Sequence, residues 1–322
     1  MTATSPALVR SLYLDQNAWI ALARGAWDKA EYPREYAALA TVIALVRDGG
    51  FVAPLSFTNI YETSKINDPV RRANLARVQS VISGGRVFRG RRRILTDTLT
   101  DYLARRYSFD REALPDAWFL SDLWFEAAAD YSPGLYGFGI SDQALALMRA
   151  NAAEVLFDYL AFNDDEARVE AVRRYSASSG ELVSNIERRR ARVEGETFAM
   201  RRRAYGAQLV LDELDFILSI GRNLGLRWKG VSDMGGSLVR SLPVDLPILN
   251  VERELVIRLE DQTRRIDEND LRDMAAFTVV LPLATIMVAE KPFVNLARQA
   301  GLGTTYETTL LTSVFDVTGD LG

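Results

Sequence analysis

The chain has 322 residues, of which 48% are hydrophobic and 25% are charged, and its formal net charge is −4 at pH 7. It contains no histidine and no cysteine, which excludes disulfides, Ser-His-Asp and Cys-His catalysis and ordinary zinc sites. An enzyme of this composition would depend on carboxylates, hydroxyls, lysine, arginine and tyrosine, or on a cation with oxygen ligands such as Mg²⁺ or Mn²⁺.

The N-terminal part is expected to alternate short strands with helices. LYL is an apolar strand that stops at Asp15 and turns into a helix. A helix over 35–50 is expected to end at a glycine pair, and one or two helices over 59–85 to break near Asp68 and Pro69. The predicted strands are 12–14, 51–56 and a weaker 86–90. This alternation predicts a parallel α/β sheet.

The rest of the chain divides into a helical middle and a second α/β part. Amphipathic patterns predict helices throughout the middle, including 117–131, 141–162 and 181–225. Strands are then expected again, at 285–291 and 308–317, with helices before and between them. We therefore predict a parallel sheet assembled from both termini, 1–95 and 262–322, and a large, mostly α-helical insertion over 96–261.

Five acidic residues stand just past a predicted strand or early in a helix: Asp15, Glu62, Asp270, Asp273 and Glu290. The carboxyl ends of parallel strands share one edge of a sheet, so these carboxylates could converge there. Carboxylates brought together repel one another unless a cation lies between them, and a hard divalent ion suits oxygen ligands. The sequence thus suggests a Mg²⁺ or Mn²⁺ site able to support phosphodiester hydrolysis by metal-activated water.

Each of these acids also has a purely structural interpretation. Asp15 could cap the helix that follows it, and Glu62 lies at capping-box spacing after Asn59. Asp270, or the asparagine before it, could be the N-cap of the later helix. Glu290 could form an exposed turn pair with the lysine that follows it. The recurrence of acids at strand ends favours a shared site.

Basic residues are concentrated near the N-terminus, where residues 1–95 contain 14 lysines and arginines against 7 acids. Five arginines fall within RVFRGRRR, over 86–93. Such a cluster is either a solvated edge or a phosphate clamp, because arginine forks match phosphate geometry. The candidate phosphate-binding residues are Arg89, Arg91, Arg92 and, with weaker support, Arg71.

Three stretches resemble PIN-like nuclease domains, in particular bacterial PIN-like proteins interrupted by a long insertion. They are YLDQNAWIALA, APLSFTNIYETSKINDPVRRANLA and NDLRDMAAFTVVLPLATIMVAEKPFVNLARQ. The resemblance covers about 1–95 and 262–315, and it implies a Rossmann-like sheet with an acidic Mg²⁺ or Mn²⁺ pocket and an endoribonuclease activity. A role as a bacterial toxin or defence effector is suggested by the resemblance alone.

The resemblance also assigns roles to particular positions. Asp15 matches the acid of the first strand, Glu62 the acid after the second strand, and Asp273, beside Asp270, the acid of the later helix. These three are the expected metal ligands, with Asp270 and Glu290 assisting. Thr285 stands where such proteins often carry an aspartate, so a weakened, nucleic-acid-binding or protein-interaction version of the fold is the alternative.

The remaining expectations concern location and partners. No run of about 18 apolar residues is present, and MTATSPALVR lacks the features of a secretion signal, which predicts a cytoplasmic protein without a membrane span. The expected partners are an RNA substrate, a protein inhibitor or neighbouring-gene product, and a second copy of the chain in a homodimer.

Overall fold

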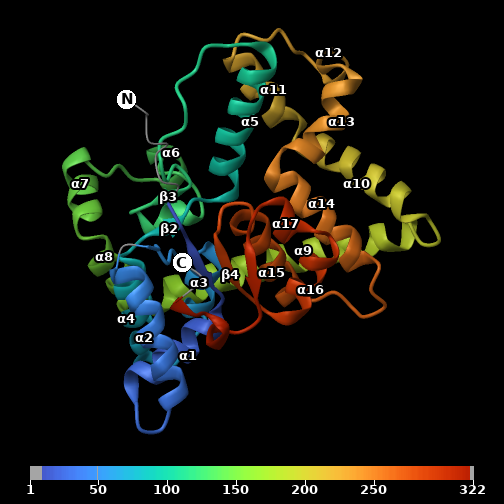
Figure 1. Cartoon of the computed structure of the whole chain (residues 1–322). Coiled ribbons are helices and arrows are strands. Elements are labelled where there is room, and N and C mark those ends of the chain that lie inside the picture. The colour runs from blue at the N-terminus through green and yellow to red at the C-terminus, as the bar shows by residue number, and fades with distance from the viewer. Residues whose placement is uncertain (1–8, 49, 320–322) are drawn as a thin grey trace, which may run out of the picture.

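The computed structural model describes residues 9–48 and 50–319, so most of MTATSPALVR lies outside the described residues. Helices dominate the structure and surround a small parallel sheet (Figure 1). The sheet has the order β1-β4-β5, made of β1 (Leu12–Leu14), β4 (Ile286–Val288) and β5 (Thr309–Leu311). Leu12 pairs with Ile286, and Ile286 pairs with Thr309, in parallel register. The prediction of a parallel sheet assembled from both ends of the chain is therefore confirmed.

Two predicted elements differ from the structure. Residues 51–56 make only isolated parallel bridges, Val52 to Ser11 and Leu55 to Val87, because Pro54 has no N–H to donate to a ladder. The helix expected over 117–131 is wrong. That segment holds β3 (Leu120–Ser121), which pairs antiparallel with β2 (Val87–Phe88), and a 3-10 helix, η1 (Trp124–Ala127).

The reason for the second error is visible in the burial pattern. The side chains at 119, 121, 123 and 125 are buried and alternate with more exposed ones, which is the period of an extended chain and not of a helix. Ala117 also has φ of +57°, a left-handed conformation that does not continue a helix.

The predicted helices of the N-terminal part form. They are α1 (Gln16–Trp27), α2 (Pro33–Arg47), α3 (Phe57–Ser64) and α4 (Pro69–Ser83). The break between the last two falls at Asp68, which caps α4 through its side chain.

The middle of the chain is helical apart from β3 and η1. Its helices are α5 (Arg91–Tyr107), α6 (Pro133–Tyr136), α7 (Asp142–Ala150), α8 (Ala152–Phe162), α9 (Asp165–Arg192), α10 (Phe198–Asp212), α11 (Leu214–Asn223), α12 (Val231–Met234), α13 (Gly236–Asp245) and α14 (Pro247–Glu260). The C-terminal part adds α15 (Glu268–Val280), α16 (Lys291–Gln299), α17 (Leu302–Thr305) and the 3-10 helix η2 (Val314–Asp316). Within the described residues, no helix combines the length and apolar character that crossing a membrane requires.

The sheet separates two hydrophobic cores. Leu12 and Leu14 of β1 point into a core formed largely with α1, α2, α4 and α8, whereas Tyr13 between them points into a larger core on the other face. In β4, Ile286 and Met287 divide between the two cores in the same way. Alternating strand side chains therefore place helices on both faces of the sheet, as in α/β folds.

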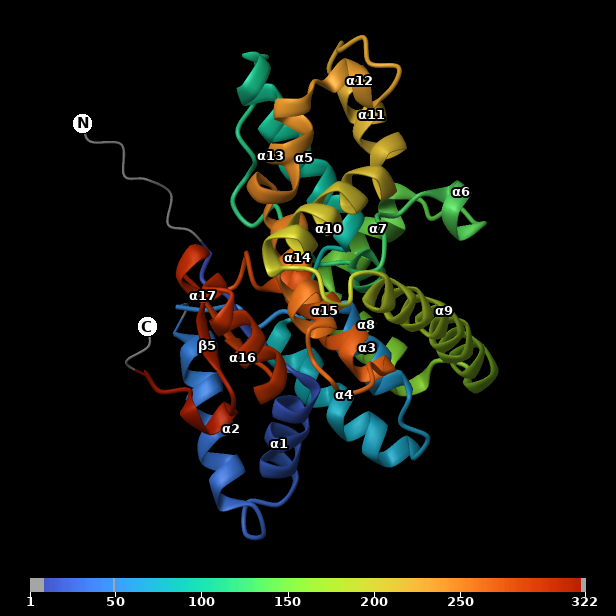
Figure 2. The same ribbon diagram turned by 90° about the vertical axis from the view of Figure 1, so that its right-hand side faces the viewer.

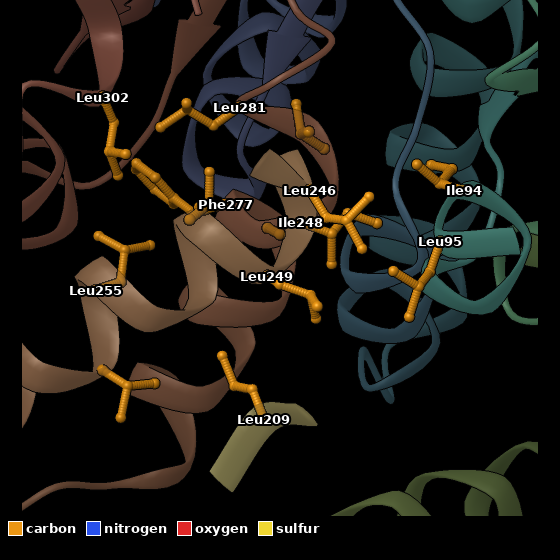
Figure 3. Close-up of a cluster of buried hydrophobic side chains, with 14 of the residues drawn as sticks. Ile94, Leu95, Leu209, Leu246, Ile248, Leu249, Leu255, Phe277, Leu281 and Leu302 are labelled. Atoms are coloured by element: carbon orange, nitrogen blue, oxygen red, sulfur yellow. The ribbon is translucent and has the colours of Figure 1, made fainter. Parts of the chain in front are cut away.

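The larger core joins the middle of the chain to its C-terminal part. Figure 3 shows Leu246, Leu249 and Leu255, around α14, beside Phe277 and Leu281 of the C-terminal part, and all five are at most 1% exposed. The long helix α9 lies against α3 and α15 (Figure 2). The middle helices α9 and α14 are thus packed onto α15, the helix that carries Asp270 and Asp273. The division of the chain into three parts stays a prediction.

Candidate acidic site

Four of the five predicted acids line one cavity at the carboxyl edge of the sheet. Asp15 directly follows β1, Glu62 lies on α3, Asp273 on α15, and Glu290 at the start of α16 after β4. Together they surround a cavity of about 120 Å³. Residues separated by as many as 275 positions thus meet because the sheet pairs the two ends of the chain.

Asp15 both caps a helix and faces the cavity, so its two interpretations are compatible. Its Oδ1 accepts a hydrogen bond of 2.8 Å from the Ala18 backbone N–H, and its own N–H donates to the Val288 carbonyl at 3.0 Å. The first contact fixes the side chain at the start of α1, and the second fixes the backbone at the edge of β4. The hydrogen bond from Ala18 holds the carboxylate in one orientation and leaves Oδ2 without a hydrogen bond among the described residues.

Glu62 lies on a helix whose capping box differs from the predicted one. Ser56, not Asn59, is the N-cap of α3, and Asn59 is its partner at the third helical position. The Asn59 side chain also donates to the Leu14 carbonyl at 3.2 Å, which ties α3 to β1. Glu62 is therefore free of any capping role and points into the cavity from the second turn of the helix.

Asp270 lies outside this cavity, which corrects its predicted assisting role. Asp267 is the N-cap of α15, and Asp270 closes the capping box by accepting from the Asp267 N–H at 2.9 Å. Its Oδ2 also accepts from Nη1 of Arg264 at 2.7 Å. Asp273, one turn further, lines the cavity and makes no hydrogen bond or ion pair within the described residues.

The carboxylates perturb one another. Burial raises the pKa of Asp15 to about 7 against the opposing effect of the hydrogen bond from Ala18, and Glu290 and Glu62 raise it further. Burial also raises the pKa of Asp273 to about 8, and the four other acids add to it. The pKa of Glu62 is raised by burial against the opposing effect of Arg272. Asp15 and Asp273 therefore keep their protons to a much higher pH than ordinary carboxyl groups do.

Arg272 is the main cation at the site, and it was not among the residues predicted from the sequence. Its Nε lies 3.2 Å from Oε1 of Glu62, although without the alignment of a hydrogen bond, and its Nη1 donates to Glu268 at 2.7 Å. The side chain is 8% exposed. Its spacing of four residues from Glu268 was the available signal. Arg272 neutralises Glu62 and leaves Asp15, Asp273 and Glu290 without a cationic partner among the described residues.

The carboxylates have the right chemistry to bind a hard divalent cation, but they are not arranged around a common point. Asp15, Asp273 and Glu290 offer carboxylate oxygens of the kind that Mg²⁺ and Mn²⁺ prefer. Glu290 is oriented by the Asn17 side chain, which donates to its Oε1 at 2.9 Å. Across residues 9–48 and 50–319, no three acidic side chains are arranged as a group that could hold an ion as they stand. Binding would require side-chain movement toward a common point.

Thr285 does not belong to the site. It precedes β4, whereas the acids lie past the other end of that strand. Its Oγ1 accepts from the Ser11 N–H at 3.2 Å, and its own N–H donates to the Ser11 carbonyl. Thr285 thus fixes the start of β4 beside the segment that leads into β1, and the predicted effect on metal affinity loses its structural basis.

Three of the four predicted phosphate-binding arginines, Arg89, Arg91 and Arg92, are engaged in ion pairs within the protein. Arg89 pairs with Glu126 and Asp130 at 3.1 and 3.0 Å, and Arg92 pairs with Glu213 at 2.8 Å. Arg71 is exposed and lines a separate cavity of about 340 Å³ beside α1 and α4. This placement corrects the expectation that these arginines clamp phosphates at the acidic cavity.

Arg91 shows most clearly why a structural role replaces the predicted one. It donates to Glu213 at 2.5 Å and to Glu252 at 2.8 Å, joining α5 to the start of α11 and to the second turn of α14. Burial alone would lower the pKa of the guanidinium, but the two carboxylates raise it above its ordinary value. Arg91 therefore offsets two acids whose side chains are only 9% and 17% exposed.

We expect Arg91→Met to destabilise the fold and leave RNA affinity unchanged. Losing hydrogen bonds to charged groups and leaving Glu252 unpaired should lower the free energy of unfolding by about 1–3 kcal/mol, measured by urea denaturation. Arg71→Met is the matched control, and this exposed change should stay within about 0.5 kcal/mol of the wild type. If Arg91→Met instead kept full stability and reduced the salt dependence of RNA binding, the phosphate-clamp interpretation would be restored.

No protein-family profile, curated protein or solved structure matches this chain significantly.

Proposed function

We propose that the chain is a divalent-metal-dependent endoribonuclease with a PIN-like fold, and that the acidic cavity is its active site. The observation that carries the proposal is the meeting of Asp15, Glu62, Asp273 and Glu290, from four separate elements, at the carboxyl edge of a parallel sheet. Ligands of open α/β sheets bind at that edge. A cluster of carboxylates with raised pKa values at a cavity is also typical of functional sites.

The residues have distinct roles in this proposal. Asp15, Asp273 and Glu290 would hold Mg²⁺ or Mn²⁺, which would supply an activated water and offset the charge of the phosphodiester. The Ala18 N–H and the Asn17 amide keep Asp15 and Glu290 oriented, so fewer side chains have to be ordered when an ion binds. Arg272 keeps Glu62 neutralised, and its guanidinium provides positive charge at the wall of the cavity.

Two observations favour a second candidate, a non-catalytic RNA-binding protein on the same fold. Arg272 already occupies the position of a counter-ion to Glu62, and the acids of the described chain do not form a closed ligand group. A protein that binds RNA without cutting it needs neither a free Glu62 nor a metal ion. The two candidates differ in metal-dependent cleavage.

The test is incubation of the purified full-length chain with single-stranded and structured RNAs in Mg²⁺, Mn²⁺ or EDTA. The nuclease predicts products in both metals or in one of them, and none in EDTA. The same oligonucleotides made as DNA establish the preference for RNA. Binding of RNA without products, by folded protein in either metal, would support the non-catalytic candidate. Cleavage that persists in EDTA would contradict the proposed mechanism.

A further inference from the structure

A second cavity adjoins the acidic one. It has a volume of about 260 Å³ and shares two lining residues, Thr58 of α3 and Ala276 of α15, with the acidic cavity. A ligand that places a phosphodiester at the acids would thus extend into this space with its neighbouring group. The cavity is near the lower end of the size range of small-molecule sites, so it suits one ring system better than an extended chain.

Aromatic and aliphatic side chains form most of the wall of this cavity. Phe57 and Tyr175 contribute rings whose centroids are 5.5 Å apart, and Phe88, Ala275 and Val279 complete the apolar surface. Tyr175 comes from α9, in the middle of the chain, and its ring lies 4.2 Å from that of Tyr61. The middle helices thus contribute a wall directly beside the proposed active site.

The charges at this cavity are already balanced. Arg89 and Arg91 lie in its wall, but both are paired with carboxylates at 3.1 Å or less. A phosphate or carboxylate would therefore find no unneutralised cation there. The hydroxyls of Ser56 and Thr58, 2.6 Å apart, add the polar groups of the wall. This combination of aromatic faces, hydroxyls and balanced charge suits an uncharged, planar, hydrogen-bonding group.

We propose that this cavity binds the nucleobase next to the scissile phosphodiester, and so restricts the substrate to unpaired RNA. The inference rests on the proposed nuclease function, because the acidic cavity must hold that phosphodiester. A base can enter only after it leaves a helical stack, and such bases are recognised by stacking on aromatic side chains. Tyr175 and Phe57 are the stacking residues, and α9 is the part of the insertion that selects the substrate.

Ala275 offers a way to block the cavity without removing a core contact. It is exposed on α15 and lines the cavity, so Ala275→Leu fills space that a base would use. Leucine is a good helix former, which keeps α15 intact. The matched control is Ala207→Leu, an exposed alanine on α10 outside both cavities. Urea denaturation and Mn²⁺ titration should give the same result for both variants.

The experiment measures RNA binding in EDTA and RNA cleavage in Mn²⁺. The substrates are one single-stranded RNA and two versions of it, each with an abasic ribose on one side of the cleaved bond. Loss of one base stack should weaken wild-type binding roughly tenfold or more at one of these positions. Ala275→Leu should weaken the binding of intact RNA by the same factor. Removing the base at that position should then weaken the binding of this variant no further. Ala207→Leu should behave as the wild type.

The remaining outcomes test the nuclease proposal and the base-binding proposal separately. Cleavage that is indifferent to both abasic positions and to Ala275→Leu would overturn the base-binding cavity and leave the nuclease standing. Binding with the expected abasic and Ala275→Leu effects, but without cleavage, would retain the cavity and overturn the nuclease. An absence of both binding and cleavage in folded protein would overturn both. If the protein binds RNA without cleaving it, no cleaved bond marks the position to test. The abasic ribose is then placed at each position of the oligonucleotide in turn.

Discussion

Asp15→Asn should abolish metal-dependent RNA cleavage while making the protein more stable at pH 8. Removing a residue that only hydrogen-bonds to a metal ligand typically lowers metal affinity or activity by about 10- to 100-fold. Removing a ligand itself should therefore lower the cleavage rate by at least about 100-fold. Asparagine retains the oxygen that accepts from the Ala18 N–H, so the start of α1 should be preserved. At pH 8 the amide also removes a charge that is buried among other acids.

The control for this change is Asp270→Asn, which removes a carboxylate one turn away from Asp273 on the same helix. Asp270 serves the capping box of α15 and the ion pair with Arg264, so its loss should reduce stability by about 1 kcal/mol. Cleavage should stay within a few-fold of the wild type, measured at a temperature where both variants are folded. Equal losses of activity in the two variants would mean that the site depends on overall helix geometry and not on Asp15 as a ligand.

The convergence of the acids could be predicted because it depends on topology alone. The apolar strands around Leu12 and Ile286, each followed by an acid, indicate a parallel sheet whose edge collects those acids. Neither the partner of each acid nor its exact contacts follow from such a pattern. Asp270 and Asp273 are three residues apart on one helix, yet one serves a cap and the other faces the cavity.

The arginines were misassigned for a related reason. A cluster such as RVFRGRRR identifies a local excess of positive charge, but the partners of Arg91 and Arg92 come from residues more than 100 positions away. Glu213 and Glu252 reach Arg91 only because α11 and α14 pack against α5. Long-range ion pairs carry no periodic signal, so a sequence cannot separate a phosphate clamp from an internal network. The same holds for Tyr175, whose place beside α3 depends on where α9 returns along the fold.

The second large effect should appear in stability against pH. Asp15 and Asp273 have pKa values of about 7 and 8 in the folded protein, against an ordinary value of 3.8. The folded state therefore binds more protons than the unfolded state between about pH 4 and pH 8. In that window the free energy of unfolding falls as pH rises, and the loss is complete above the folded pKa values. This direction is opposite to that of an ion-paired carboxylate.

The size of the effect follows from the shifts. Each pKa unit corresponds to about 1.4 kcal/mol, but the two acids are coupled and partly hydrated, so a total on the order of 3 kcal/mol is expected between pH 5.5 and pH 8.5. Glu213 and Glu254, whose pKa values are lowered, act in the opposite sense, but only at pH values below their ordinary value of 4.5. The acidic cavity therefore dominates the window that is measured.

Divalent cations should reverse this loss if the cavity is a metal site. At pH 8.5, Mg²⁺ would replace the protons that neutralise the cavity and raise the free energy of unfolding, measured by urea denaturation against EDTA. At pH 5.5 protons compete with the cation, so the increase should be much smaller. Asp15→Asn should make the pH profile shallower, because Asp273 still titrates, and should weaken the response to Mg²⁺. Asp142→Asn, which changes an exposed acid on α7, should leave both unchanged.

These responses separate the two candidate functions without any measurement of cleavage. A pH profile that falls as expected but ignores Mg²⁺ would mean that the acids converge while Arg272 and protons remain their only partners, as the non-catalytic candidate requires. A free energy of unfolding that rises with pH would show that the folded protein stabilises the ionised forms of Asp15 and Asp273, as it would if each had a cationic partner. A nuclease site in which the cation supplies the missing positive charge requires a profile that falls with pH, that Mg²⁺ restores, and that Asp15→Asn makes shallower.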